Sequence, residues 1–159
     1  MGVDLCGMKP EDYGPEYQSH LLEQYKLYVE MADQVSHRRS AANNYMVTVN
    51  ASLVTLYGLA SSVAGSGKQG LWIYAVPAAG VLACLAWVAV IRSYRDINTA
   101  KFKVIHEMEK RLPAALFAFE WQIAGEGKSE EYWPTSHIEQ IVPWVFSGLY
   151  ILLAIFAYA

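Results

Sequence analysis

The sequence is poor in charged residues and in cysteine. Charged residues make up 17% of the 159 residues, below the roughly 25% that is usual for soluble domains. The two cysteines, Cys6 and Cys84, are too few for a disulfide framework. The net charge is −3, and binding to a nucleic-acid backbone would require a clustered basic surface. The composition therefore argues against a disulfide-rich protein and against a nucleic-acid partner.

Clusters of catalytic or metal-binding residues are also lacking. The four histidines are scattered over separate segments, and neither cysteine has a neighbouring base that would mark it as a nucleophile. The segment Gly65-Ser66-Gly67-Lys68 resembles a phosphate-binding loop only in part, because Ser62 and Gln69 stand where that motif has glycine and serine or threonine. We therefore expect no enzymatic activity and no cofactor or metal ion.

Long apolar stretches are abundant. They run from Tyr45 to Val63, from Leu71 to Ile91 and from Ile141 to Ala159. A helix needs about 20 apolar residues to cross a bilayer core about 30 Å thick. The first two stretches are joined by the short segment AGSGKQG. We predict a transmembrane helical hairpin followed by a third transmembrane helix. The third stretch is barely long enough, so an interfacial or re-entrant helix is the alternative there.

Basic residues flank the hairpin on its outer sides. Arg38 and Arg39 precede the first apolar stretch, Arg92 and Arg95 follow the second, and Lys68 is the only charge in the turn. Lysine and arginine accumulate on the cytoplasmic side of membrane proteins. The N-terminus is thus predicted to be cytoplasmic and the C-terminus extracytoplasmic. The first twenty residues lack the basic start and apolar core of a secretory signal peptide.

The fold class predicted is all-α, with long cytoplasmic extensions on both hairpin helices. From Pro15 to Val63 there is no further proline and only one glycine, Gly58, which favours one long helix. Apolar residues spaced by four and three form a seam from Leu21 to Val35, for packing within the protomer or for a self-associating coil. The predicted segments are a flexible tail at 1–14, a cytoplasmic helix at 15–43, transmembrane helices at 44–63, 71–91 and 138–159, an extracytoplasmic turn at 64–70, cytoplasmic amphipathic helices at 92–124 and a loop at 125–137.

Polar side chains occur at bilayer depth in the first apolar stretch. On a helical wheel Asn44, Thr48 and Thr55 fall on one side, whereas Asn43 and Asn50 fall on another. Such side chains usually face protein or water rather than lipid. Either both faces pack on neighbouring helices, or one face is shared by a ring of subunits and lines a pore. These five residues are the candidate pore or inter-subunit residues, with Asn50 the first choice for a ring at membrane depth.

Two stretches of the sequence resemble the RipA family of bacterial octameric membrane proteins, namely YKLYVEMADQVSHRRSAANNYMVTVNASLVT and, after the hairpin, SYRDINTAKFKVIHEMEKRLPAALFAFEW. Together they cover roughly residues 25–56 and 93–121. The resemblance implies a homo-oligomer, specifically an octamer, in the bacterial cytoplasmic membrane. It implies no catalytic residues.

A second set of candidate residues lies where the helices leave the membrane. Arg95 and Asn98 should lie just beneath the bilayer, near the height of Arg38 and Arg39 on the antiparallel helix. With Lys101, these residues are predicted to form an interfacial polar network that ties the two helices, or neighbouring subunits, together. Such a network must be fully satisfied to be tolerated where water is scarce.

The sequence therefore predicts a three-span membrane protein whose partners are copies of itself and membrane lipids. The function predicted is a structural or pore-like assembly with a cytoplasmic helical layer. The alternative is a membrane scaffold or regulatory protein that recruits an unknown cytoplasmic protein through residues 93–121.

Overall fold

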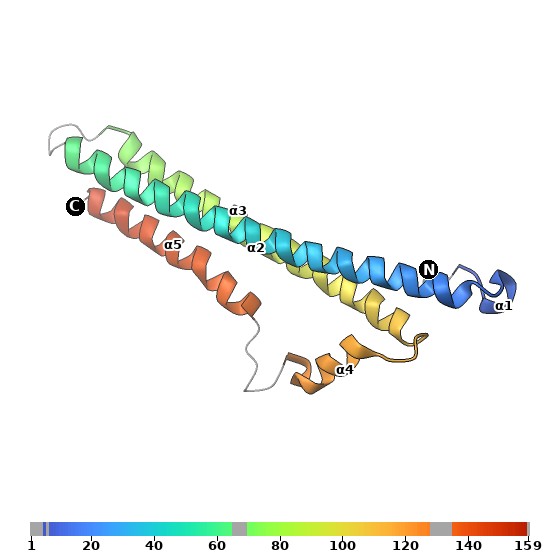
Figure 1. The fold of residues 1–159 in the computed structure, drawn as a ribbon. Coiled ribbons are helices and arrows are strands. Elements are labelled where there is room, and N and C mark those ends of the chain that lie inside the picture. Colours follow the sequence, from blue (N-terminus) through green and yellow to red (C-terminus); the bar gives the residue numbers. More distant parts are fainter. Residues whose placement is uncertain (1–4, 6, 65–69, 128–134, 159) are drawn as a thin grey trace. The chain divides into compact units, whose positions relative to one another are not determined.

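The computed structural model describes residues 5, 7–64, 70–127 and 135–158. Within these ranges the chain is all-helical, as predicted, and its long helices are drawn in Figure 1. The elements are α1 (Pro10–Tyr13), α2 (Tyr17–Ala64), α3 (Trp72–Glu109), α4 (Leu116–Ile123), the short 3-10 helix η1 (Gly125–Gly127) and α5 (Thr135–Tyr158). Three of the helices, α2, α3 and α5, are long and apolar enough to cross a membrane.

The first two long helices extend well beyond their apolar stretches. With 48 residues, α2 is about 72 Å long at 1.5 Å per residue, more than twice the thickness of a bilayer core. The 38 residues of α3 also run on past its apolar part and end at Glu109, before Pro113. The predicted long helices at these positions are therefore confirmed. Of the turn predicted at 64–70, residues 65–69 lie outside the described residues.

The remaining elements refine the predicted segments. The four-residue helix α1 lies in the stretch predicted to be a flexible tail, of which residues 1–4 and 6 lie outside the described residues. The 24-residue helix α5 begins at Thr135, inside the predicted loop 125–137, of which residues 128–134 are also not described. At about 36 Å, α5 is long enough to cross a bilayer core.

The chain divides into two compact units. Unit 1 comprises Met1–His37 and Tyr94–Trp133, and unit 2 comprises Arg38–Ser93 and Pro134–Ala159. In unit 1 the buried apolar residues of α2 are Leu21 and Ala32, and those of α3 are Ile105 and Met108. The seam predicted on α2 therefore packs within its own protomer.

In unit 2 the central helix is α3. A third (33%) of its apolar window is buried, compared with 11% for α2 and 17% for α5. Its buried residues recur every three or four positions, which is one face of a helix; among them are Ile73, Cys84, Trp87 and Ile91. Large apolar residues on the outer faces, such as Leu56 and Leu82, are exposed. Apolar residues on the outer faces suit contact with lipid, because lipid tails are as apolar as the side chains that face them.

Candidate functional site

Asn50 is fully buried in unit 2, where it contacts two other helices. Its Nδ2 donates to the carbonyl of Met46 at 2.8 Å, one turn earlier on α2. Its Oδ1 accepts from the hydroxyl of Tyr150 on α5 at 3.1 Å and from Sγ of Cys84 on α3 at 3.5 Å. An unsatisfied polar group in hydrocarbon costs several kcal/mol. The Asn50 amide avoids this cost by bonding to its own chain, and it holds the three helices together within the protomer. Its predicted place in a ring of subunits stays a prediction.

Tyr150 reaches Asn50 because Gly80 on α3 leaves room for its ring. A Cβ placed on Gly80 would lie 2.4–2.5 Å from three ring carbons of Tyr150, and real Cβ atoms do not approach so closely. Small residues let membrane helices come together in this way. Gly80, Tyr150 and Asn50 thus form one contact that joins the three long helices of unit 2.

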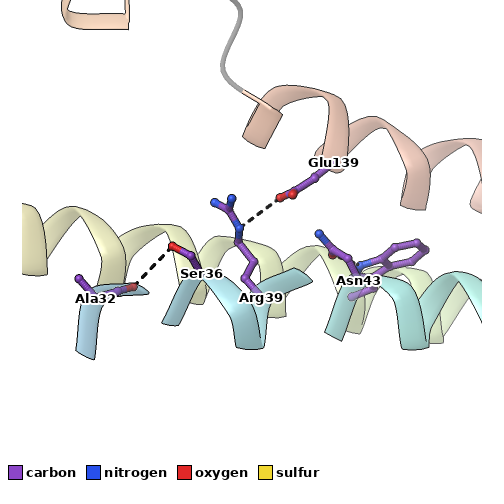
Figure 2. A network of polar contacts seen from close by, with 6 residues as sticks. Ala32, Ser36, Arg39, Asn43 and Glu139 are labelled. Atoms are coloured by element: carbon purple, nitrogen blue, oxygen red, sulfur yellow. Dashed lines mark hydrogen bonds and ion pairs between the residues drawn. The ribbon is translucent and has the colours of Figure 1, made fainter. Parts of the chain in front are cut away.

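Asn43 and Arg39 make a second polar layer in unit 2, shown in Figure 2. Nε1 of Trp87 donates to Oδ1 of Asn43 at 2.9 Å, and Nδ2 of Asn43 has no hydrogen-bond partner within the described ranges. Nε of Arg39 on α2 lies 3.4 Å from Oε2 of Glu139 on α5. That distance is longer than the roughly 2.8 Å of a strong charged hydrogen bond. Both side chains of this ion pair are mostly covered.

The other three candidate residues at bilayer depth lie on the exposed face of α2. Asn44, Thr48 and Thr55 are all exposed. The Thr48 hydroxyl donates to the Asn44 carbonyl and the Thr55 hydroxyl to the Ala51 carbonyl, each at 2.9 Å. Gly58 continues this face, and apart from its chain neighbours and the adjoining helix backbone no atom of the described residues lies within 4 Å of the position of a Cβ there. Unit 2 therefore encloses Asn50, partly covers Asn43, and leaves exposed a stripe of small and polar residues (Asn44, Thr48, Ala51, Thr55, Gly58).

Two residues of the predicted interfacial network, Arg39 and Lys101, contact partners outside that set. Arg39 pairs with Glu139 in unit 2, whereas Nζ of Lys101 lies 4.5 Å above the ring of Tyr28 in unit 1. Arg38 and Arg95 are exposed, and Asn98 is half-buried. Oδ1 of Asn98 is buried without a hydrogen-bond partner in the described part of the chain. Their predicted role in tying subunits together stays a prediction.

Unit 1 contains a buried polar site at the carboxylate of Glu109, which sequence reasoning did not single out. Glu109 is only 1% exposed. Its Oε1 accepts from the backbone N–H of Phe117 at 2.8 Å, and its Oε2 accepts from that of Ala118 at 2.9 Å. Oε1 also accepts from the hydroxyl of Tyr25 on α2 at 3.0 Å. One buried carboxylate therefore joins α2, α3 and α4.

Glu109 acts as the missing N-cap of α4. The N-cap residue Ala115 has no side chain that could bond the first turn, and the free N–H groups of a helix start need acceptors. Phe117 and Ala118 are the second and third residues of α4, the positions whose N–H groups a capping side chain normally accepts. The negative charge also lies at the positive end of the helix dipole. Glu109 thereby fixes where α4 begins.

Tyr25 remains a hydrogen-bond donor to this carboxylate over a wide pH range. Burial raises the pKa of its phenol from 10.0 to about 12, with further contributions from the hydrogen bond to Glu109 and from its charge. Each of these favours the neutral phenol. No sequence motif marks this pair, because Tyr25 and Glu109 lie 84 residues apart in the chain.

A groove of about 520 Å³ lies beside this site in unit 1. Its floor is mainly apolar and its rim carries Lys26, Glu30 and Asp33. The other lining residues are Tyr25, Val29, Ala32, Ser36, Phe102, Ile105 and Phe117. Across the described segments, no three histidine, cysteine or acidic side chains are grouped so that they could hold a metal ion.

The chain was compared with protein-family models, with curated proteins and with solved structures. The sequence model of the Octameric membrane protein family (8xMP) matches residues 22–159, which include nearly all of α2 and the whole of α3, α4 and α5. No curated protein and no solved structure matches the chain.

Proposed function

Because the chain belongs to the octameric membrane protein family, we propose that eight copies form a non-enzymatic ring with a structural or pore-like role. The proposed location is the bacterial cytoplasmic membrane, with unit 1 and the N-terminus in the cytoplasm and the C-terminus outside. The basic residues flanking the hairpin support this orientation. The narrower likeness to the RipA family is consistent with the same assembly.

The observation that carries the proposal is the uncovered stripe on α2. Its members Asn44, Thr48, Ala51, Thr55 and Gly58 are spaced by four and three residues and are all exposed. Small residues at this spacing allow a second helix to approach closely within a membrane. The threonine hydroxyls already donate to carbonyls of their own helix. A neighbouring helix that covers them would therefore not leave them without a hydrogen-bond acceptor. We assign this stripe to the contact between subunits and to the wall of a central opening.

Bulky substitutions on the stripe test the proposal. Thr48→Phe and Thr55→Phe each place a large ring at an exposed position, so the protomer itself should still fold. If the stripe is a subunit contact, each variant should break the ring into smaller species on native gels. Leu56→Phe is the matched control, because Leu56 is exposed on the same helix but about 100° around it from Thr55.

A planar-bilayer recording then separates a pore-like role from a structural one. A pore should pass current that Thr55→Phe abolishes, whereas a structural ring should pass none. If Thr55→Phe leaves the ring as intact as Leu56→Phe does, the stripe is not the subunit contact.

A scaffold function is the second candidate, and the surface of unit 1 favours it. The groove beside Glu109 and the exposed apolar residues of α4 are features that a protein partner can bind. A scaffold should give no conductance and should co-purify with one stoichiometric partner that is lost when residues of unit 1 are changed.

A further inference from the structure

Unit 1 presents a narrow apolar ridge on the outside of α4. Leu116, Phe119 and Ile123 are 68%, 64% and 71% exposed. Their spacing of three and four residues places them on one face of the helix, the pattern by which a helix inserts into a groove. We call these three residues the α4 ridge. Exposed large apolar side chains that cluster in this way mark an interaction surface.

The α4 ridge cannot fill the groove of its own unit. Phe117, which lies about 100° around the helix from Leu116, already forms part of the groove wall. The carboxylate of Glu109 fixes this rotation of α4 through the N–H groups of Phe117 and Ala118. The same unit therefore carries a projecting apolar surface and an apolar groove of about 520 Å³, and it directs the two to different sides of α4.

We propose that the α4 ridge of each subunit inserts into the unit 1 groove of the next subunit around the ring. A contact between two different surfaces of identical chains is head-to-tail, and repetition of such a contact closes a ring. The inference rests on the proposed octamer and names the surfaces by which unit 1 takes part in it. The ring would then be held both by α2 within the membrane and by α4 in unit 1.

Membership of an octameric family makes a second copy the occupant that is present in the assembly, and the charges beside the two surfaces restrict the direction of docking. Glu120 flanks the α4 ridge and is exposed, and Lys26 lies on the groove rim. Lys26 contacts Glu23 at 3.1 Å, but both side chains are more than half exposed, so this pair is easily exchanged. The rim carboxylates Glu30 and Asp33 would repel Glu120. They therefore favour the docking direction in which Glu120 faces Lys26.

The composition of α4 disfavours a lipid surface as the occupant. The eight residues of α4 include the acidic Glu120 and no lysine or arginine. Helices that lie on a membrane surface usually carry basic residues toward anionic headgroups. A different protein as the occupant is one of the outcomes that the following test distinguishes.

Photo-crosslinking in the full-length assembly tests the proposal. One copy carries p-benzoylphenylalanine at position 119, and a co-expressed second copy carries a long affinity tag and no probe. We expect a crosslinked species with the mass of one copy plus one tagged copy, and we expect the attached peptide to lie within residues 25–36. The matched control carries the probe at position 121, where Trp121 is also exposed but lies about 140° around the helix from Leu116.

The outcomes separate this inference from the proposed octamer. If the assembly keeps its octameric mass but the probe at position 119 attaches only to its own chain, to lipid, to another protein or to nothing, the inference is wrong and the octamer stands. Equal crosslinking from positions 119 and 121 also contradicts it. If the unmodified protein does not form an octamer, the proposed function fails before any crosslink is made.

A charge exchange gives an independent measurement. Glu120→Lys and Lys26→Glu should each raise the concentration at which the assembly dissociates by a few-fold, as expected for charges at the rim of an interface. The double variant should restore it. Phe119→Asp should raise it by about tenfold or more, the effect of removing a central aromatic anchor. Failure of the double variant to recover, together with no effect of Phe119→Asp, would refute the docking.

Discussion

Replacement of Glu109 by alanine should release α4 while leaving the membrane helices intact. In the wild-type chain the carboxylate accepts from the N–H groups of Phe117 and Ala118 and from the hydroxyl of Tyr25, at 2.8, 2.9 and 3.0 Å. Removing an N-cap costs about 1 kcal/mol, and leaving a buried donor without an acceptor costs about 1–3 kcal/mol. We therefore expect Glu109→Ala to lower the free energy of opening of α4 by about 2–4 kcal/mol.

Hydrogen exchange measured by mass spectrometry reports this loss directly. At about 1.4 kcal/mol per factor of ten, amide exchange in residues 114–124 should accelerate by roughly 30-fold to 1,000-fold. Peptides from α5 should be unaffected in the same sample. Tyr25→Phe removes one of the three donors and leaves the cap in place, so it should have a smaller effect. Glu109→Gln keeps only one oxygen acceptor and should fall between alanine and the wild type.

The matched control is Glu107→Ala. Glu107 lies two residues earlier on α3, is more than half exposed, and pairs with Lys110 one turn away. A surface pair of this kind contributes less than about 1 kcal/mol. If Glu109→Ala and Glu107→Ala change exchange of residues 114–124 to the same extent, the buried carboxylate does not hold α4, and the fixed orientation of the α4 ridge is refuted.

Three further predictions concern other contacts. Gly80→Ala should lower the melting temperature in detergent, because the new methyl group displaces the ring of Tyr150 and overpacking costs about 1–3 kcal/mol; a Gly80→Ala/Tyr150→Ser variant should lose less than the sum of the two changes. The pH titration followed by ultraviolet absorbance should differ between the wild type and Tyr25→Phe by one phenol with a pKa of about 12. Since the folded state favours the neutral phenol, its contribution to stability is complete below pH 10 and is lost between pH 10 and 12, and a midpoint near 10 would contradict the burial. Arg39→Ala and Glu139→Gln should each cost about 1–2 kcal/mol, and the double variant should be no worse than the more damaging single change.

The long helices could be predicted because local signals determine them. The apolar stretch from Leu71 to Ile91 and the position of Pro113 bracket α3 from Trp72 to Glu109 closely. A chain with so few helix-breaking residues between Pro15 and Val63 has little alternative to a long helix. Periodicity likewise identified the seam of unit 1, since a buried stripe repeats every three or four residues whatever it packs against.

The polar contacts could not be predicted in the same way, because their partners are distant in sequence. The sequence marks Asn50 as a polar residue at bilayer depth but does not reveal Tyr150, which contacts it from 100 residues away. Likewise, Glu109 reads as one more charge on a charged helix until Tyr25 and α4 are placed around it. The helical wheel separated Asn50 from Thr55, but only the structure shows that the first is enclosed and the second exposed.

The mass of the intact assembly tests the central claim most directly. Native mass spectrometry of the protein, extracted in detergent and freed of it in the gas phase, should give eight chains of 17.8 kDa, or about 142 kDa. The same measurement on Thr55→Phe should show smaller species, and on Leu56→Phe it should again show eight chains. A monomer as the largest species of the unmodified protein would contradict the account.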